Sequence, residues 1–315
     1  MSTALLDSVR QETAEALLTV HQSTDGAQAG EVSFRDWIPR SERKQCQRLF
    51  VASSVAGVTR YVAKVPLDPD DAMVDREWEV LSGPVGTDLP RPRAVRKLDR
   101  GFVMTYVPSR DFPEALGADR PEARPRRLRT AVELAARLHT SGRGSATGRQ
   151  PAADYLPTAD FPTATTDWIN RASVGPTHGD LGPWNLRVDQ DDRVSLIDWE
   201  DYRPDGLPAL DVLNLVLTAA LIAYPDYPEL GFDRLFELVF HEQNAFRDAA
   251  DQALRHYAAR TGQQVEGIIG LTPVFCRWMI RRIERQGRPT GHLFYGPFAD
   301  RFEAELPRWN GGGRD

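Results

Sequence analysis

The interpretation of this chain rests on the stretch His178-Gly179-Asp180-Leu181-Gly182-Pro183-Trp184-Asn185, followed by Val194-Ser195-Leu196-Ile197-Asp198-Trp199-Glu200. The first run is rich in turn formers and carries Asp180 and Asn185, and the second is a short apolar strand closed by Asp198. Two carboxylates and one amide can therefore converge on one volume. Mg²⁺ takes oxygen ligands from one or two protein groups plus substrate phosphates, and phosphoryl transfer needs a further carboxylate to orient the attacking hydroxyl. The pattern indicates magnesium and phosphate chemistry, whereas turn and strand-end roles alone do not require all three groups at this spacing.

The pattern H-G-D-x-x-x-x-N, then twelve residues, then D-W-E, resembles the signature of the aminoglycoside phosphotransferase and choline kinase family. Protein kinases carry H-R-D-x-x-x-x-N and D-F-G instead, so the departures after His178 and Asp198 favour a small-molecule acceptor. The resemblance implies that Asp180 is the catalytic base and that Asn185 and Asp198 ligate magnesium. It also implies that His178 and Asp211 support the catalytic loop, although Asp211 also suits a helix N-terminus, where the dipole stabilises a carboxylate.

Composition bounds the class of protein. The 315 residues predict two lobes, and 41% hydrophobic with 27% charged residues is typical of a globular protein. The net charge of -6 argues against a general nucleic-acid binder. No signal peptide or membrane span is expected. Cys46 and Cys276 give neither a disulfide framework nor zinc spacing, so we expect a cytoplasmic protein.

Lys64 is a candidate nucleotide ligand because the chain has only three lysines. It lies in the second of two predicted strands, 46–52 and 59–65, which form a hairpin. The resembled family places such a lysine against the α and β phosphates and pairs it with a glutamate of the next helix. That helix is predicted over 70–81, and the family spacing favours Glu77, with Glu79 as the alternative. A surface ion pair would be the plain structural role of Lys64.

Two further segments are nucleotide contacts by resemblance. A strand connection near residues 39–44 would cover the phosphates, although exposed basic turns are common. The run 104–107 would form the hinge that bonds adenine through backbone groups, after strands near 91–97 and 101–108. The candidate contacts are Ser41, Arg43, Lys44, Thr105 and Val107.

The predicted fold is α+β, bilobal and protein-kinase-like. The small lobe, 1–106, should contain an N-terminal helix over 4–20, a mostly antiparallel five-stranded sheet and one further helix. The large lobe, 107–315, should be mainly helical, with an irregular connection over 141–166 and His139 as a packing residue. Its helices are expected over 125–139, 211–223, 231–260, 265–286 and 298–306, and a disordered tail over 310–313.

The predicted function is magnesium-dependent transfer of the γ-phosphate of ATP or GTP to a hydroxyl of a small acceptor. An aminoglycoside, another antibiotic, a sugar or an amino alcohol would serve, without nucleic acid or membrane partners, and antibiotic resistance is one possible role. The alternatives are a nucleotide-binding pseudokinase that regulates a partner protein, and a nucleotidyl transferase. Ten carboxylates against three arginines over 201–251 favour an amine-bearing acceptor. Four arginines on one helix face, however, accommodate a neutral or anionic one: Arg277, Arg281, Arg285 and Arg288.

Overall fold

The computed structural model describes residues 3–24, 26–39, 47–85, 88–108, 110–117, 121–141, 161–307 and 309. The chain divides into two compact units, Met1–Ser109 with Ser195–Asp201, and Arg110–Val194 with Tyr202–Asp315. The predicted boundary after residue 106 did not include the return of residues 195–201 to the first unit. Residues 195–201, which contain Asp198, lie with the first unit because Trp199 is fully buried there and its N–H donates to the Glu77 carboxylate.

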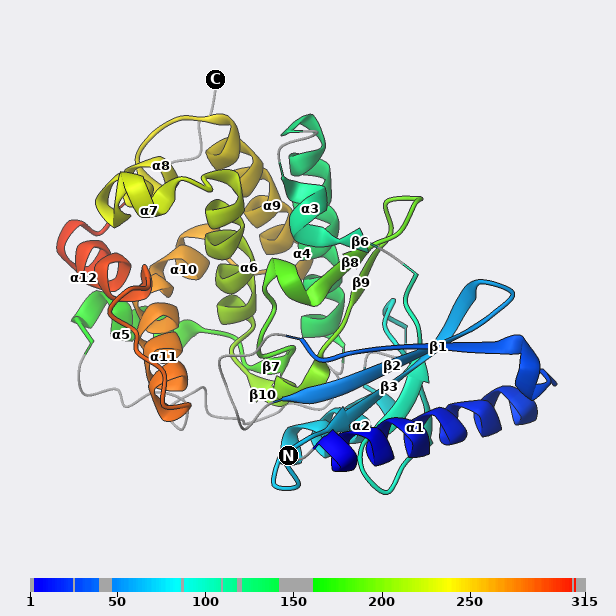
Figure 1. Cartoon of the computed structure of the whole chain (residues 1–315). Coiled ribbons are helices and arrows are strands. Elements are labelled where there is room, and N and C mark those ends of the chain that lie inside the picture. The colour runs from blue at the N-terminus through cyan, green and yellow to red at the C-terminus, as the bar shows by residue number, and fades with distance from the viewer. Residues whose placement is uncertain are drawn as a thin grey trace. The chain divides into compact units, whose positions relative to one another are not determined.

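The first unit contains a five-stranded antiparallel sheet in the order β1-β2-β3-β5-β4 (Figure 1). Ala56 and Gly57 join β2 to β3 and both have positive φ, which is the geometry that favours a two-residue hairpin turn. The predicted sheet and hairpin are confirmed. The strands are β1 (Val32–Trp37), β2 (Arg48–Val55), β3 (Val58–Pro66), β4 (Ala94–Lys97) and β5 (Phe102–Thr105), and η1 (Ala29–Glu31) precedes them.

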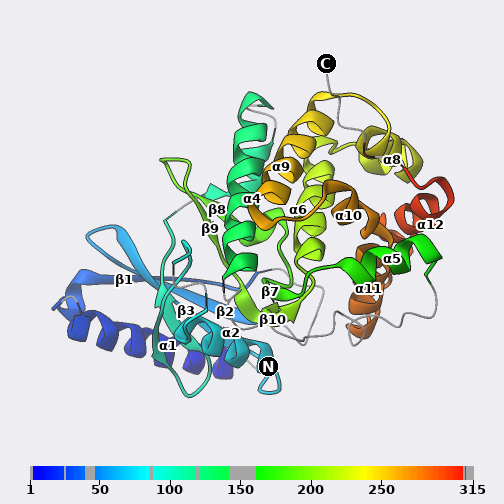
Figure 2. The same ribbon diagram turned by 180° about the vertical axis from the view of Figure 1, so that it is seen from behind.

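Helix α1 (Thr3–Thr24) runs along one face of this sheet, as the two opposite views show (Figures 1 and 2). Val9, Leu17 and Val20 of the helix join a buried cluster with alternate residues of β3, namely Tyr61, Ala63 and Val65. Successive side chains of a strand point to opposite faces of the sheet. Lys64 therefore points away from α1, towards the face where α2 contacts β3 and β5.

Helix α2 (Ala72–Ser82) occupies the position predicted for 70–81. Its first turn is capped by Asp71, whose side chain accepts a hydrogen bond from the Met73 N–H at 3.1 Å. The helix ends at Gly83, which donates its N–H to the Glu79 carbonyl. Because Asp71 caps this short helix and the buried Glu77 lies within it, α2 fixes two carboxylates beside the sheet.

The second unit is mainly helical and is centred on α6 (Pro208–Ala223), which is buried on nearly all sides and contacts α4 and α9 (Figures 1 and 2). Short strands pair as β6 (Arg110–Asp111) with β8 (Leu186–Val188), and β7 (Gly175–Thr177) with β10 (Arg203–Gly206). The remaining elements are α3 (Phe112–Leu116), η3 (Pro121–Ala123), α4 (Arg124–Thr140), α5 (Thr163–Arg171), η5 (Pro183–Asn185), α7 (Tyr227–Leu230), α8 (Phe232–Phe240), α9 (Ala245–Thr261), α10 (Val265–Gly270), α11 (Thr272–Arg285) and α12 (Tyr295–Glu305). The chain passes back to the first unit through β9 (Val194–Leu196) and η6 (Trp199–Asp201).

Two predicted helices are wrong because each is interrupted. The range 231–260 is divided into α8 and α9 because the Asn244 side chain bonds the last turn of α8 and the first turn of α9. It accepts from the Arg247 N–H at 2.9 Å and donates to the Leu238 carbonyl at 2.8 Å. The range 265–286 is divided into α10 and α11 at Leu271, where Pro273 at the start of α11 has no N–H to continue the earlier helix.

The irregular connection predicted up to residue 166 is also wrong in its last part, because α5 begins at Thr163. Its side chain Trp168 lies against Gly270, where a Cβ atom would come within 2.5 Å of the indole. Tertiary packing of this aromatic side chain gives the segment a helical role that its composition did not indicate. The predicted tail over 310–313 lies outside the described residues. No helix among the described residues is long and apolar enough to cross a membrane.

Candidate functional site

Lys64 lies at the centre of a buried group of charges in the first unit. Its Nζ atom is 2.5 Å from Glu77 Oε2, 2.7 Å from Asp198 Oδ1 and 3.2 Å from Glu200 Oε2. The Lys64 and Glu77 side chains are only 3% and 2% exposed, whereas that of Asp198 is 33% exposed. Glu77 makes the contact that the sequence predicted for it, while Glu79 lies exposed on α2. Three residues from different parts of the chain are thus joined through one ammonium group.

Arg48 is a second buried cation in this group, and the sequence analysis did not identify it. Its Nε atom is 2.8 Å from Asp71 Oδ2, and its Nη1 donates to Glu200 Oε2. Glu200 therefore accepts from both Arg48 and Lys64. The D-W-E motif contained Glu200, but no rule of local spacing could indicate that a residue at the start of β2 would bind it.

The carboxylates of this group exceed its cations. Four negative side chains, Glu77, Asp198, Glu200 and Asp71, surround two positive ones. Burial opposes the charge of Lys64, but attraction to Asp198, Glu77 and Glu200 outweighs it and raises the lysine pKa. Burial and the neighbouring Asp198 charge raise the pKa of Glu200 to about 7, although both cations oppose this shift. The excess negative charge makes the group suited to an additional cation.

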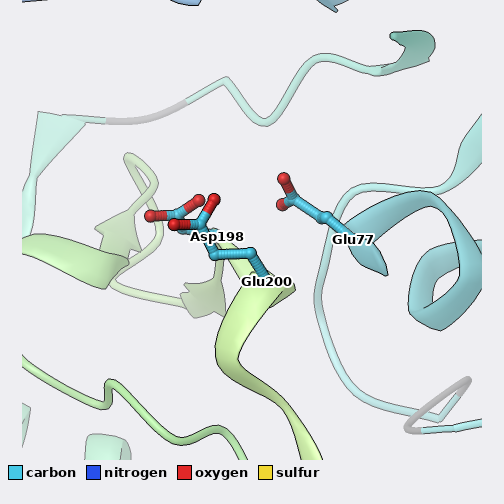
Figure 3. A group of neighbouring side chains, drawn as sticks. All are labelled: Glu77, Asp198 and Glu200. Carbon is cyan, nitrogen blue, oxygen red and sulfur yellow. The ribbon is translucent and has the colours of Figure 1, made fainter. Parts of the chain in front are cut away.

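Three of these carboxylates can offer oxygen atoms to one ion. Ligand atoms from Glu77, Asp198 and Glu200 lie within 4.8 Å of one another, and Figure 3 shows the three groups pointing toward one another, Glu77 from α2 and the others from the 195–201 segment. Carboxylate oxygens are the ligands that hard divalent cations take in proteins. Lys64 Nζ already contacts an oxygen of each of the three, so Asp198, the most accessible member, is the one suited to bind Mg²⁺ beside the lysine.

The backbone at Asp198 is strained in a way that aspartate tolerates. Its φ is 64°, in the left-handed region that non-glycine residues rarely adopt. Aspartate and asparagine enter this region more readily than other residues because their short polar side chains can bond locally. The conformation occurs where strand β9 has ended and η6 has not begun, so it turns the carboxylate out of the strand direction. Such local strain is typical of functional positions.

The loop that begins at His178 in the second unit is held by Asp211. Its two carboxylate oxygens accept from the backbone N–H of His178 at 2.6 Å and of Gly179 at 3.0 Å. Gly179 has φ of 83°, which glycine adopts without strain, so adjacent N–H groups can point to one carboxylate. Asp211 also lies in the first turn of α6, where the helix dipole favours its charge. Asp211 thus combines hydrogen bonds to the loop with a position in the first turn of a helix.

His139 also contributes to this arrangement, so packing alone does not describe it. Its Nε2 atom is 3.1 Å from Asp211 Oδ2, and its Nδ1 atom is 2.8 Å from the Tyr257 hydroxyl. An ionised carboxylate only accepts hydrogen bonds, so Nε2 carries the proton and Tyr257 donates to Nδ1. All three residues are buried. This chain of bonds fixes the Asp211 carboxylate through Oδ2, the oxygen that also accepts from the His178 N–H.

Asp180 has an ion-pair partner that the sequence analysis did not identify. Arg282 Nη1 lies 3.0 Å from Asp180 Oδ1, and the Asn214 amide approaches the same oxygen at 3.4 Å. Asn185 donates its Nδ2 to the Asp180 backbone carbonyl at 2.7 Å, which leaves the Asn185 amide oxygen as its possible metal ligand. Asp180 and Asn185 are thus joined in one loop of the second unit. Their convergence with Asp198, which belongs to the first unit, stays a prediction.

The predicted adenine hinge has only one suitable backbone group at Thr105. Its N–H donates to the Arg93 carbonyl at 2.9 Å, and its side-chain oxygen accepts from the Arg93 N–H. A base would therefore have to use the Thr105 carbonyl. Val107 stays a predicted contact. The candidate phosphate contacts Ser41, Arg43 and Lys44 lie outside the described residues.

Comparison with known proteins finds one matching sequence family and several similar solved structures. A sequence model described as "Phosphotransferase enzyme family" matches residues 47–234, more than half of the chain. No curated protein matches the chain in sequence. Among solved structures, choline kinase LicA from Streptococcus pneumoniae is similar at 16% identity and a TM-score of 0.51, over 94% of this chain and 96% of that one. An ethanolamine kinase from Plasmodium vivax is similar at 12% identity and a TM-score of 0.53, over 93% and 88%.

A third similar structure is the streptomycin-ATP-APH(2'')-IIa ternary complex, at 13% identity and a TM-score of 0.51, over 91% of this chain and 97% of that one. At these identities the likenesses show the fold alone. They confirm the predicted α+β, protein-kinase-like class.

Proposed function

Because this chain belongs to the phosphotransferase enzyme family, as its motifs predicted, we propose that it transfers the γ-phosphate of ATP or GTP to a hydroxyl of a small molecule. The observation that carries the proposal is the buried contact of Lys64 with Glu77 and Asp198 in the first unit. Phosphoryl transfer is catalysed mainly by positioning and by electrostatic stabilisation. A fixed ammonium beside an accessible carboxylate would position a nucleoside triphosphate with its cation, and it would stabilise the charge on the phosphates.

Lys64 would contact the α and β phosphates, held in place by Glu77. Asp198 and Asn185 would ligate Mg²⁺, and the excess of carboxylates around Lys64 fits such an ion. Bound there, the metal would neutralise charge on the phosphates. Lys64 keeps its proton throughout, because its pKa is raised by the surrounding carboxylates. It therefore acts as a permanent positive charge.

Asp180 would orient the acceptor hydroxyl and receive its proton. The hydroxyl oxygen forms a bond to the γ-phosphorus, the bond from this phosphorus to the bridging oxygen breaks, and the diphosphate leaves. The hydroxyl proton passes to Asp180 Oδ2, because Oδ1 already accepts from Arg282 and Asn214. Asp211 and His139 keep the loop in position through the His178 and Gly179 N–H groups.

The sequence contains Asp180 as well as Asn185, Asp198 and Lys64. This argues against the pseudokinase alternative, because a protein that only binds nucleotide needs no catalytic base. The acceptor could be an amino alcohol, an aminoglycoside or another hydroxylated compound. The solved relatives named above include a choline kinase, an ethanolamine kinase and an aminoglycoside phosphotransferase complex. A nucleotidyl transferase would release inorganic pyrophosphate instead of ADP or GDP.

The test is an acceptor screen with magnesium and ATP or GTP, in which phosphorus NMR identifies the products. ADP or GDP with a phosphorylated acceptor is expected. Asp180→Ala should lower turnover by about 10²- to 10⁴-fold with nucleotide affinity nearly unchanged. Asp198→Asn should weaken binding of the magnesium-nucleotide complex, and Asp191→Asn, at an exposed carboxylate, is the matched control. Turnover of Asp180→Ala within twofold of wild type would remove Asp180 from the mechanism.

A further inference from the structure

Arg282 of α11 places a fixed positive charge on the residue proposed as the base. Its Nη1 atom is 3.0 Å from Asp180 Oδ1 and 3.4 Å from the Gly179 carbonyl. Its guanidinium carbon lies 5.5 Å from the centre of the Trp278 ring, one helical turn earlier, and its side chain is only 12% exposed. A guanidinium that is stacked on an aromatic ring and bonded at two points stays close to Asp180.

This contact leaves one side of the Asp180 carboxylate to the acceptor. Oδ1 accepts from Arg282 and lies 3.4 Å from the Asn214 amide. No described residue bonds to Oδ2, and the Asp180 side chain is 22% exposed. An acceptor hydroxyl that binds Oδ2 would lie on the same carboxylate that Arg282 contacts through Oδ1. The charge of a group next to that hydroxyl is therefore the property that Arg282 could discriminate.

The charge of Arg282 sets a preference at this point. An ammonium group beside its guanidinium would meet repulsion. An acidic group would gain charge-assisted hydrogen bonds, which are about twice as strong as neutral ones.

Four of the ten carboxylates that favoured an amine-bearing acceptor are engaged by other groups of the second unit. Glu237 pairs with Arg301, Glu242 with Arg234 and Asp251 with Arg255. Asp211 is occupied by the loop N–H groups. These four carboxylates therefore contribute little to an attraction for cations, so the count of ten overstates that attraction.

We infer that the acceptor carries an acidic group, a carboxylate or a phosphate, close to the hydroxyl that is phosphorylated, and that Arg282 recognises it. The inference rests on the proposed function and defines its substrate class. A guanidinium has five N–H donors in a planar fork that matches carboxylate and phosphate oxygens. Arg282 can therefore hold Asp180 and the acidic group of the acceptor together. It is a positioning and specificity residue, since the proton passes to Asp180.

The test compares acceptors that differ in one charged substituent. Glycerate, glycerol 1-phosphate, glycerol and 3-amino-1,2-propanediol share one skeleton, and glucuronate, glucose 6-phosphate, glucose and 6-amino-6-deoxyglucose share a sugar ring and differ at C6. With full-length protein and magnesium ATP, at least one acid should have a kcat/KM about tenfold or more above its neutral and cationic counterparts. Whether this preferred acid is a carboxylate or a phosphate ester shows which of the two groups the site recognises. A preference for the amines, or equal rates within a set, would overturn the inference.

Variants identify the residue responsible. Arg282→Gln should raise the KM for the preferred acid by about ten- to a hundredfold, as expected for one charged hydrogen bond, with the KM for ATP unchanged. Arg282→Lys should restore part of the preference. Arg285→Gln, at an exposed arginine three residues along α11, is the matched control and should leave it intact. If Arg282→Gln lowers turnover of all acceptors by one factor, Arg282 only positions Asp180 and the specificity role is excluded.

The wild-type series does not depend on the folding of any variant. If an acceptor without an acidic group is phosphorylated while every acid fails, the inference is wrong and the proposed function stands. If no hydroxyl compound of a wider library is phosphorylated although nucleotide binds, the proposed function fails, and the inference with it.

Discussion

Replacing Glu200 by glutamine should stabilise the protein at alkaline pH in the absence of divalent cations. Glu200 is buried in a group whose four carboxylates exceed the two cations Lys64 and Arg48. Burial, and then the Asp198 charge, raise its pKa from 4.5 to about 7. Glutamine keeps the acceptor oxygen and resembles the protonated acid at every pH. The substitution therefore removes excess charge with little change of shape.

The sign and size follow from the pKa. A folded-state pKa above the unfolded one means that the native protein binds the proton more tightly. The resulting stabilisation is fully present below pH 4.5 and is lost as pH rises through about 7. At pH 8 the ionised Glu200 thus costs about 3 kcal/mol relative to a neutral side chain, and at pH 5 less than about 1 kcal/mol. For a chain of this length, 3 kcal/mol corresponds to about 5 °C in Tm.

The assay is thermal and urea unfolding of wild type and Glu200→Gln in EDTA, between pH 5 and pH 8. The variant should gain about 5 °C over wild type at pH 8 and little at pH 5, and added Mg²⁺ should narrow the gap by neutralising the wild-type group. Glu79→Gln, at an exposed position of α2, is the control and should show no such pH dependence. A gap that is the same at both pH values would refute the charge argument.

Three further predictions concern positions that hold the site. In a double-mutant cycle, Lys64→Ala and Glu77→Ala should be non-additive in nucleotide affinity by about 1 to 3 kcal/mol; additive effects would separate the two residues. Gly101→Ala should destabilise the protein by more than about 2 kcal/mol in urea unfolding, because its Cβ would lie 2.1 Å from the Lys64 carbonyl at a φ of 87°. Gly57→Ala, with positive φ but open space, should cost about 1 kcal/mol, and equal costs would contradict the clash. His139→Gln should preserve slow amide exchange in the loop at 178–179 through its side-chain donor, and His139→Leu should accelerate it; equal exchange in both would show that the histidine only packs.

Local patterns in the sequence were sufficient for much of the first unit. The hairpin needed only alternating apolar residues and the turn at Ala56 and Gly57, and α2 needed only its cap at Asp71 and its stop at Gly83. The pairing of Lys64 with Glu77 followed from family spacing, and the structure places the two side chains 2.5 Å apart. These features depend on residues within one element or on neighbouring ones.

Long-range partners could not be predicted in the same way. Arg48 and Glu200 are 152 positions apart, and Asp180 and Arg282 are 102 apart. Neither pair has a spacing rule, because tertiary packing alone brings its members together. The prediction of one continuous helix over 231–260 was wrong for a related reason. Apolar periodicity continued across Asn244, while the two caps made by its side chain ended one helix and began the next.

The placement of partners within each unit has a consequence for function. The Lys64 ammonium contacts carboxylates of the first unit, and the Asp180 carboxylate contacts side chains of the second. A substitution around Lys64 changes charges that face the nucleotide phosphates in our proposal, whereas one around Asp180 changes the group that receives the acceptor proton. Nucleotide affinity and acceptor selectivity should therefore respond to different sets of mutations. A substitution at Arg282 should therefore change which acceptor charge is preferred without changing the charge balance around the nucleotide phosphates.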